Sequence, residues 1–474
     1  MKPVRRCAGL LLVCFFLLTQ IACAAADTEK NKIQKLRFSQ TAEKVRIVLD
    51  TTNYPEFTAL RSDHPLQVVV DMPNTVNVGA PARTMFNDPF VEGVTVAAAG
   101  SGQVRVTVDL KMAGMYQVHA LKAPNRLFID IVKTYEKKVQ QKIMPGLTYT
   151  SWQRSQAQGP VWAHVLDMDP KTGFALQPVL SNDEVLKLET LLPMAQRHQA
   201  VAAVNGSYFA PNGEIIGLLK LNGQIVSTPQ LARTALGIFP NGQLLIDQIA
   251  YQGTLALPDG RTQLINGVNR QRDEDELVLY NAYYGDTTGT NLYGSEYVVQ
   301  NNKITAITNG HTAIPASGYV LSTHGQAAKS LSGLKVGDSV NLTQTLGPLW
   351  DKTTTALGAG PMLVKNGSVY LTTKIEEFGT DVAGGRAPRT ALGVTKDGRI
   401  LLVVVDGRQQ NSIGLTLLEM AFLMQELGAE NALNLDGGGS SEMVIDNKIV
   451  NAPSDGHERA LGDALLVLST KLAN

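Results

Sequence analysis

Residues 33–132 alternate apolar and polar positions in short runs, the pattern of half-buried β-strands. Turn-forming residues such as Pro55, Pro65 and Asn74 separate the runs, and several runs end at or near an aspartate. The pattern predicts an all-β sandwich domain over residues 27–134. Its strands are expected at VRIVLD (45–50), LQVVVDM (66–72), VRVTVDL (104–110), YQVHAL (116–121) and RLFIDIV (126–132).

From residue 147 onward the pattern mixes two periods. SNDEVLKLETLLPMAQRH (181–198) predicts a helix with a cap at its first residues, and AVAAVNGSYF predicts a buried strand that ends at Asn205. The polar stretch 135–146 predicts a linker. We therefore expect an α+β protein: a sandwich followed by a second domain over residues 147–474, with a mixed β-sheet and packed helices.

An internal repeat runs through this second domain. RTALGIFPNGQLLI (233–246) recurs as RTALGVTKDGRILLV (389–403), and an Asn-Gly hairpin precedes each copy. Two copies are too few for a solenoid, so we expect two similar β-modules that face a shared cleft. Arg233 and Arg389, which open the copies, are candidates for the cleft or for buried ion pairs that fix the modules.

A strand, a helix and a second strand follow one another closely near the C-terminus. GRILLVVVDGR (398–408) ends at Asp406, TLLEMAFLMQELGAE has helical spacing, and NALNLDGGG ends at Asp436. Short connections of this kind make the two strands parallel. If they are neighbours, the Asp406 and Asp436 carboxylates lie about 5–8 Å apart at the edge where α/β sheets bind ligands. An ordinary Asp-Gly turn is the open alternative for Asp406.

The three glycines after Asp436 have no side chains, so an anion could approach the backbone closely there. Gly437, Gly438 and Gly439 expose backbone N–H groups, and Ser440 and Ser441 add hydroxyl donors. Guanidinium groups match phosphate oxygens in a two-pronged fashion, which makes three arginines further candidates. They are Arg389, Arg408 and Arg459.

Composition restricts the class of partner and the compartment. The 474 residues carry 42 basic and 42 acidic side chains, so no charge excess indicates nucleic acid. MKPVRR, an apolar run and small residues before Asp27 predict a signal peptide over residues 1–26, with an uncleaved anchor as the alternative. All three cysteines lie there, so the mature chain would have no disulfide and no thiolate metal site. We expect an exported protein that is periplasmic, cell-wall-associated or extracellular, without a transmembrane domain after cleavage.

Two resemblances follow from these motifs. RTALGV, VVVDGR, SIGLTLLEMA, ELGAENALNLDGGGSSEM, IVNAPSD and ERALGDALLV, in this order, resemble the phosphodiester glycosidase family, and VNGSYF (204–209) also fits. The strands of 33–132 resemble an AMIN domain. The resemblances imply hydrolysis of sugar-1-phosphodiester bonds, such as those of N-acetylglucosamine 1-phosphodiesters, and binding to peptidoglycan or another cell-wall polymer.

The resemblance also implies roles for residues. Asp436 would act at the anomeric carbon as nucleophile or base, with Asp406 as its partner or as a ligand of a sugar hydroxyl. Arg389, Arg408 and the glycine segment would receive the phosphate. Asn205, Asn434 and Glu442 would hold the sugar or orient the acids, although Glu442 could equally alternate outward along its strand.

Two other functions stay open on the sequence alone. Asp406 and Asp436 could bind Mg²⁺ or Ca²⁺ in a phosphodiesterase that attacks phosphorus, so a divalent cation is a candidate cofactor and none is certain. The chain could also be a non-catalytic protein that binds a cell-wall polysaccharide. The expected substrate is an envelope polymer or exopolysaccharide with sugar-phosphate diester links.

Overall fold

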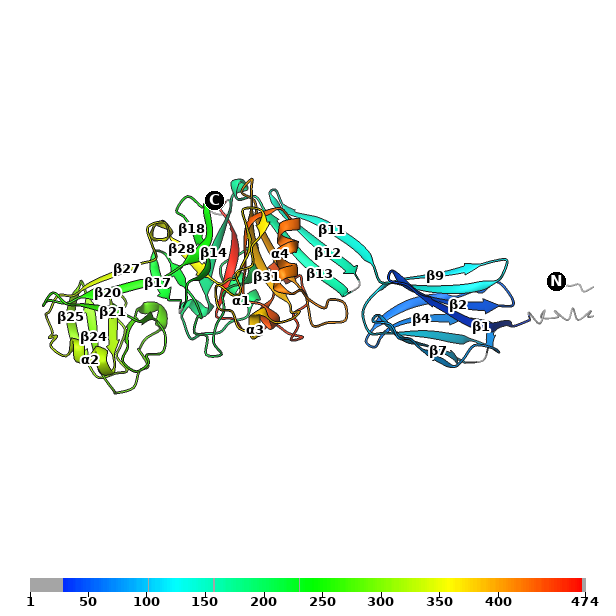
Figure 1. Cartoon of the computed structure of the whole chain (residues 1–474), viewed down its shortest axis with the longest axis horizontal. Coiled ribbons are helices and arrows are strands. Elements are labelled where there is room, and N and C mark those ends of the chain that lie inside the picture. The colour runs from blue at the N-terminus through cyan, green and yellow to red at the C-terminus, as the bar shows by residue number, and fades with distance from the viewer. Residues whose placement is uncertain (1–28, 101, 157, 230, 471–474) are drawn as a thin grey trace, which may run out of the picture.

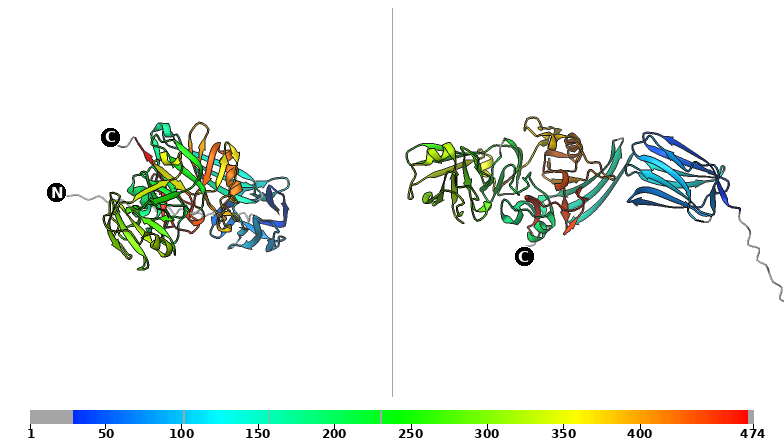
Figure 2. Two further views of the ribbon diagram at one scale, coloured as in Figure 1. Left: turned by 60° about the vertical axis from the view of Figure 1, so that its left-hand side comes forward. Right: turned by 90° about the horizontal axis from the view of Figure 1, so that it is seen from below.

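The computed structural model describes residues 29–470 except 101, 157 and 230. Three β-rich parts lie in a row and give an elongated molecule, as Figure 1 and Figure 2 show. The expected signal peptide lies outside the described residues. Within 29–470, apart from those three positions, no helix is both long enough and apolar enough to cross a bilayer.

The N-terminal part consists of two five-stranded sheets that share one buried core. The alternation predicted from the sequence is present, since every second residue of β2 and β4 is buried. All five predicted strands are confirmed, and five more complete the sheets. One sheet has the order β5-β1-β2-β10-β9, with β1 (Asn31–Gln40), β2 (Lys44–Thr51), β5 (Thr75–Asn77), β9 (Met115–Leu121) and β10 (Arg126–Val132). The other has the order β3-β4-β8-β7-β6, with β3 (Thr58–Asp63), β4 (Leu66–Met72), β6 (Arg83–Met85), β7 (Val91–Ala98) and β8 (Val104–Leu110).

The aspartates near the ends of these strands form ion pairs across neighbouring strands. Such pairs fix strand register on a solvated face, which is a structural role. The pairs are Asp50 with Arg37 at 2.6 Å, Asp71 with Arg105 at 2.7 Å and Asp130 with Arg46 at 2.6 Å.

The central part contains an eight-stranded sheet with the order β11-β12-β13-β32-β31-β33-β29-β30. All six residues of β32 are buried, because sheet neighbours cover its edges and other elements cover both faces. The strands are β11 (Tyr135–Met144), β12 (Leu147–Gln156), β13 (Gly159–Met168), β29 (Met362–Lys365), β30 (Ser368–Val369), β31 (Arg389–Thr395), β32 (Ile400–Val405) and β33 (Ala429–Asn434).

Two five-stranded sheets complete the central part and share a core with the large sheet. One has the order β14-β36-β15-β34-β35, with β14 (Phe174–Leu180), β15 (Ala202–Asn205), β34 (Met443–Ile445), β35 (Lys448–Ile449) and β36 (Asp463–Ser469). The other has the order β17-β16-β28-β18-β19, with β16 (Leu219–Leu221), β17 (Gln224–Ser227), β18 (Arg233–Ile238), β19 (Leu244–Ile249) and β28 (Thr355–Gly358). The helices are α1 (Leu191–Arg197), α3 (Thr380–Ala383) and α4 (Leu417–Glu426), with the 3₁₀ turns η1 (Pro170–Thr172), η2 (Ser181–Asp183), η4 (Trp350–Lys352) and η5 (Gly438–Ser440).

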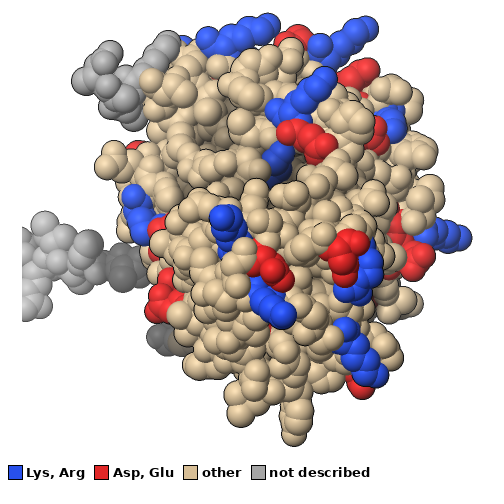
Figure 3. Space-filling model, turned by 90° about the vertical axis from the view of Figure 1, so that its left-hand side faces the viewer, with Lys and Arg blue, Asp and Glu red and all other residues tan. Residues whose placement is uncertain are grey.

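The third part is an insert between β19 and β28 at the far end of the molecule (Figure 1). On this end, basic and acidic side chains are interspersed over a mostly uncharged surface (Figure 3). Its sheets have the orders β21-β20-β27 and β22-β23-β26-β24-β25. The elements are β20 (Gln252–Ala256), β21 (Thr262–Ile265), β22 (Gly267–Val268), β23 (Leu277–Tyr280), η3 (Ala282–Tyr284), β24 (Ser295–Gln300), β25 (Lys303–Thr308), β26 (Tyr319–Thr323), α2 (Gly325–Leu331) and β27 (Asn341–Thr345).

The internal repeat has a structural counterpart. The first copy forms the order β17-β16-β28-β18-β19, and the second forms β30-β29-β33-β31-β32 inside the larger sheet. The registers also agree, since Ala235 pairs with Gly358 and Ala391 pairs with Asn434. The sequence ALGAGP (356–361) therefore lies where the second copy has ALNLDG (432–437), so Gly360 corresponds to Asp436.

Several expectations were wrong. The α+β description overstates the helices, because strands hold 49% of the residues and helices 10%. Segment 181–198 is helical only from Leu191, after a turn in which Asn182 and Asp183 have positive φ. The predicted linker 135–146 is mostly strand β11, which pairs with β12 along its whole length.

The predicted crossover is parallel but not between neighbours. Strand β31 lies between β32 and β33 and runs antiparallel to both. The ends that carry Asp406 and Asp436 are therefore separated by two strand spacings, about 10 Å. Helix α4 lies where the periodicity predicted it, and a capping box of Thr416 and Glu419 begins it.

Candidate functional site

A cavity of about 540 Å³ opens at the edge of the large sheet where β33 ends. Both repeat copies contribute to it, through Arg233 from β18 and Arg389 from β31. This agrees with the predicted shared cleft. Its lining carries four arginines and two aspartates, so the charged groups give it a positive balance. They are Arg233, Arg389, Arg408, Arg459, Asp381 and Asp436.

Asp436 lies on the wall of this cavity, directly after β33. Its backbone is fixed, because its N–H donates to Gly206 O at 3.0 Å and its carbonyl accepts from Asn205 Nδ2 at 2.7 Å. Its carboxylate Oδ1 accepts from the N–H of Gly437 at 2.8 Å. Burial raises the pKa of Asp436 to about 6, although the Gly437 bond and the charge of Arg459 lower it. At neutral pH this carboxyl is ionised and close to its titration range.

A second carboxyl, Asp463, lies behind Asp436 and was missed at the sequence level. It begins β36 and is 1% exposed, and it accepts from Ser207 N at 2.8 Å and Ser207 Oγ at 2.6 Å. Burial, and then the neighbouring Asp436 charge, raise the pKa of Asp463 to about 7, against the Ser207 bonds. The pairing of β36 with β15 sets Ala464 opposite Asn205, so Asp463 lies beside the residues that follow Asn205, and no local pattern in the sequence indicates this.

Tyr208 was also missed, although it belongs to the quoted VNGSYF motif. Its hydroxyl donates to Gly360 O at 2.9 Å and accepts from Asn434 Nδ2 at 3.0 Å. Both Tyr208 and the predicted Asn434 line the cavity. Asn434 Oδ1 is buried and has no hydrogen-bond partner among the described residues, so it remains an acceptor for a bound hydroxyl.

The two repeat arginines differ in what they bind. Arg389 is 3% exposed and donates to three carbonyls, of Leu415, Val382 and Gly385. It therefore joins β31 to the loops around the cavity. Arg233 donates from Nε to Glu376 O at 3.2 Å, and its guanidinium lies 4.2 Å from the centre of the Phe378 ring. Neither forms an ion pair with a described acidic residue, contrary to the alternative considered from the sequence.

The glycine segment brings arginines close, and the backbone donors of two of its three glycines are already occupied. Gly437 N–H donates to Asp436 and Gly438 N–H donates to Pro388 O, so these groups are occupied. A Cβ on Gly439 would overlap the Arg459 guanidinium, and one on Gly438 would lie 3.3 Å from Arg408. The predicted backbone cradle is therefore replaced largely by guanidinium groups.

Arg408 and Arg459 line the same cavity but have different partners. Arg459 is held by Asp455, with Nη2 2.6 Å from Oδ2. Arg408 is exposed and makes no hydrogen bond or ion pair with any described residue. Its φ of 59° is in the left-handed region that L-residues seldom adopt. Arg408 is thus the cavity cation with the most donors left for a ligand.

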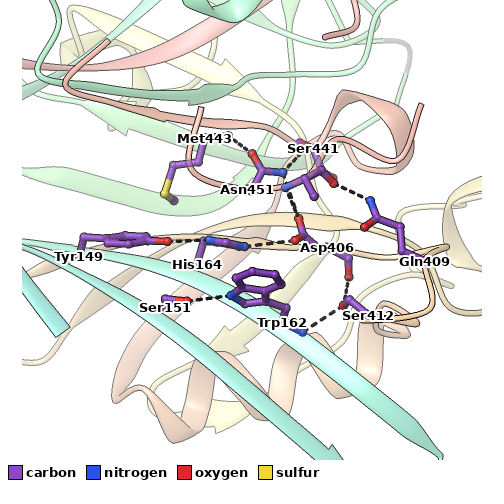
Figure 4. Close-up of polar contacts among 11 residues, drawn as sticks. Tyr149, Ser151, Trp162, His164, Asp406, Gln409, Ser412, Ser441, Met443 and Asn451 are labelled. Atoms are coloured by element: carbon purple, nitrogen blue, oxygen red, sulfur yellow. Dashed lines mark hydrogen bonds and ion pairs between the residues drawn. The ribbon is translucent and has the colours of Figure 1, made fainter. Parts of the chain in front are cut away.

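Asp406 does not join this site. It is 1% exposed and lines neither the cavity nor its rim. Its Oδ1 accepts from Asn451 Nδ2 at 3.2 Å and from Ala452 N at 3.0 Å. Its Oδ2 accepts from His164 Nε2 at 3.2 Å, which leaves Nδ1 to accept from the Tyr149 hydroxyl (Figure 4). Asp406 therefore anchors the segment after β35 to β13 and β32.

Three other predicted residues also lie away from the cavity wall. Asn205 is 1% exposed and supports Asp436 from behind, and Ser441 and Glu442 are equally buried. Burial, and then the neighbouring Glu458, raise the pKa of Glu442 to about 9, so it is a neutral acid at pH 7. Neither Ser441 nor Glu442 lines the cavity.

The described residues contain no group of three or more His, Cys, Asp or Glu side chains able to hold a metal ion. Because Asp406 lies outside the cavity, the two predicted carboxylates do not converge on a shared cation. The tyrosine-rich stretch 281–299 belongs to the insert and does not line the cavity.

Comparison with known proteins finds two family matches. Residues 293–468 match the phosphodiester glycosidase family, and residues 35–130 match the AMIN domain. The SPbeta prophage-derived uncharacterized protein YomE of Bacillus subtilis is 44% identical over 80 residues, which cover 17% of this chain and 12% of that protein. The chain thus spans only a small part of this relative.

Two of the relatives have named activities. The N-acetylglucosamine-1-phosphodiester alpha-N-acetylglucosaminidase of Mus musculus is 34% identical over 102 residues, 20% of each chain. The N-acetylmuramoyl-L-alanine amidase AmiC of Neisseria meningitidis is 31% identical over 137 residues, 27% of this chain and 32% of that one. A crystal structure of a hypothetical protein from Synechocystis has the same fold, with a TM-score of 0.66, 22% identity and coverage of 93% of this chain and 81% of that one.

Proposed function

We propose that this chain, which carries a phosphodiester glycosidase domain after an AMIN domain, hydrolyses sugar-1-phosphodiester bonds in a polymer of the bacterial envelope. The observation that carries the proposal is one cavity in which a carboxylate, Asp436, lies among four arginines. A glycosyl phosphate needs both: a carboxylate for the oxocarbenium-like carbon and cations for the departing phosphate.

Asp436 would act at the anomeric carbon, as nucleophile or as base. Its carboxylate is ionised above pH 6 and is held by Gly437 N–H, which fixes its direction. Asp463 behind it would keep a proton near neutrality and so limit the negative charge at this point. Because phosphate is a good leaving group, a strong general acid at the departing oxygen is not required.

Arg408 and Arg233 would receive the phosphate, since the N–H groups of Arg389 are largely occupied by carbonyls. Asn434 and Tyr208 would hold sugar hydroxyls, through the free Oδ1 of the amide and the phenol oxygen. Asn205 would act as a positioning residue, because it holds the backbone of Asp436 from outside the cavity.

The AMIN match and the amidase relative support an exported or periplasmic protein related to the cell envelope. The AMIN domain would bind peptidoglycan or an associated polymer and keep the glycosidase domain near its substrate. The relatives that are glycosidases by name match only 20% of this chain. We therefore base the proposed substrate, an envelope polymer, on the presence of an AMIN domain beside the glycosidase domain.

Hydrolysis of α-N-acetylglucosamine 1-(methyl phosphate) in ¹⁸O-labelled water tests the reaction. Attack at carbon places the label in the released sugar, and attack at phosphorus places it in the phosphate. Label in methyl phosphate would contradict the glycosidase mechanism and favour a phosphodiesterase. Absence of turnover on this and other α-linked sugar-1-phosphodiesters, with polymer binding retained, would favour a binding protein.

A further inference from the structure

A second depression of about 970 Å³ lies between the AMIN domain and the glycosidase domain. We call it the interdomain groove. The first domain contributes Ala113, Gly114 and Met115, and the second contributes Trp162 and the loop 408–411. A backbone hydrogen bond from Ala113 N to Gln410 O, 2.8 Å long, joins the two domains along it.

The interdomain groove borders the cavity beside Asp436. Arg408 lines both, and segment 452–459 runs between them, with Ala452 and Pro453 in the groove and Arg459 in the cavity. The Asp406 contacts hold this boundary in place, because they tie Ala452 to β13 and β32 beside Trp162 (Figure 4). A molecule bound at Arg408 therefore has open space on both sides.

The lining of the groove suits an anionic carbohydrate. Aromatic faces bind sugar rings and amide groups bind hydroxyls, whereas cations bind phosphate or carboxylate. Among the described residues that line it, none is acidic. The groove offers Tyr135, Trp162, Gln153, Gln409, Gln410 and Arg408 for these contacts.

We propose that the interdomain groove binds the chain that continues beyond the phosphate, so that the substrate is an anionic glycan polymer cleaved at an internal or terminal link. This inference rests on the proposed function, because the proposed function decides which end of the substrate enters the groove. If the sugar occupies the cavity beside Asp436 and the phosphate meets Arg408, only the group on the far side of the phosphate can enter the groove. The AMIN domain then forms one wall of the substrate site and does more than tether the enzyme.

The test compares a short with a long leaving group. The substrates are α-N-acetylglucosamine 1-(methyl phosphate) and a synthetic hexamer of N-acetylglucosamine 1-phosphate. We expect wild-type kcat/KM to be at least about tenfold higher for the hexamer, because remote contacts contribute to transition-state binding. Equal values for the two substrates would overturn the inference and leave the proposed function standing.

Met115 provides a matched pair of variants. It is 47% exposed, lines the groove and lies away from the cavity. Met115→Glu adds a negative charge against an anionic chain, whereas Met115→Gln has nearly the same size without the charge. The Glu variant should lose about fivefold in kcat/KM on the hexamer at low salt, and neither should change on the methyl diester. Equal hexamer kinetics for both variants would count against the inference.

Binding gives a readout that does not require turnover. Trp162 lines the groove, whereas the other two tryptophans, Trp152 and Trp350, are buried and do not line it, so a change in emission caused by a bound chain arises mainly from Trp162. Titration of Asp436→Asn protein with the hexamer should change this emission, more weakly when Met115→Glu is added. If wild type cleaves neither substrate, the proposed function fails, and this titration still decides whether the groove binds the chain. No change in emission would overturn the inference.

Discussion

The two copies of the repeat share a strand order and a register but differ at the positions that meet the cavity. Each begins with an arginine on the central strand, Arg233 in one and Arg389 in the other. The strand beside it ends in ALGAGP in the first copy and in ALNLDG in the second, so Gly360 stands where the second copy has Asp436. The two copies thus share their strand arrangement and their arginine, but only the second copy has a carboxylate at this position.

This difference shows how one duplicated module can serve two purposes. The first copy offers a carbonyl, Gly360 O, which accepts from the Tyr208 hydroxyl. A Cβ at Gly360 would overlap the Glu376 carboxyl and lie 3.3 Å from the Phe378 ring, and the φ of 87° at this position disfavours L-residues. The first copy therefore cannot carry a matching aspartate without rebuilding its surroundings, and we expect one carboxylate to act at the reacting carbon.

The largest effect should come from the position that distinguishes the copies. Asp436→Asn should lower kcat by about 10²–10⁴-fold, because the amide has no negative charge for the reacting carbon. Stability should change little, since the Gly437 N–H can still donate to the amide oxygen. Steady-state kinetics with thermal melting checks this. An active Asp436→Asn enzyme would place the reaction elsewhere.

The repeat arginines should separate catalysis from stability. Arg389→Lys loses bonds to three buried carbonyls and should cost about 2 kcal/mol or more in the free energy of unfolding. Arg233→Lys keeps the charge but loses the planar fork, and should lower kcat/KM about tenfold with a smaller loss of stability. Urea denaturation and kinetics on the same two proteins measure both. Identical profiles would mean that the copies are functionally equivalent.

The pH dependence should reflect the second copy alone, since the first has no carboxyl at this place. Asp436 must be ionised to act, and its pKa is raised from 3.8 to about 6. Activity should therefore fall as the pH is lowered through 6, by about tenfold per unit below it. A kcat/KM profile between pH 4 and 8 checks this. A plateau down to pH 4 would exclude Asp436 as the group that titrates.

The smallest effect concerns the threonines that follow the two arginines. Thr234 donates to the buried Glu376 carboxyl at 2.5 Å, and Thr390 donates to the Asn205 amide oxygen at 2.7 Å. Thr234→Val should cost about 1.5–3 kcal/mol, and Thr390→Val about 1 kcal/mol, because bonds to ionisable acids contribute more than neutral bonds. Denaturant midpoints distinguish them. A larger loss of unfolding free energy for Thr390→Val than for Thr234→Val would indicate that the hydrogen bond to Asn205 contributes more to stability.

The sequence predicted local features better than it predicted neighbours. Alternation located the sandwich strands, and the helical spacing of apolar residues located helix α4. The same reasoning placed Asp406 beside Asp436, because it took two parallel strands joined by a helix to be adjacent. Strand β31, which precedes both in the chain, lies between them. The β31–β32 pair is a local hairpin, but the pairing of β31 with β33 is long-range and leaves no trace in the period of a short segment.

Asp436 and Arg408, which follow buried strands, were predicted from the sequence, whereas Asp463, which begins β36, was not. Asp436 follows β33 and Arg408 follows β32, each before or after glycine, which makes them conspicuous. Asp463 starts β36 and lies at the same edge only because β36 runs antiparallel to β15. The raised pKa of Glu442 could not be predicted from the sequence either, since it depends on burial and on the proximity of Glu458 in the folded chain.

The left-handed backbone at Arg408 has a consequence for how this protein can change. An L-residue in that conformation costs about 1–2 kcal/mol, and glycine would largely remove the penalty. Selection for folding stability alone would thus favour glycine in place of Arg408, and the guanidinium between the cavity and the groove would be lost. Arg408 therefore lowers the stability of the fold locally. Variant libraries screened only for heat resistance should accumulate glycine at this position and yield inactive protein.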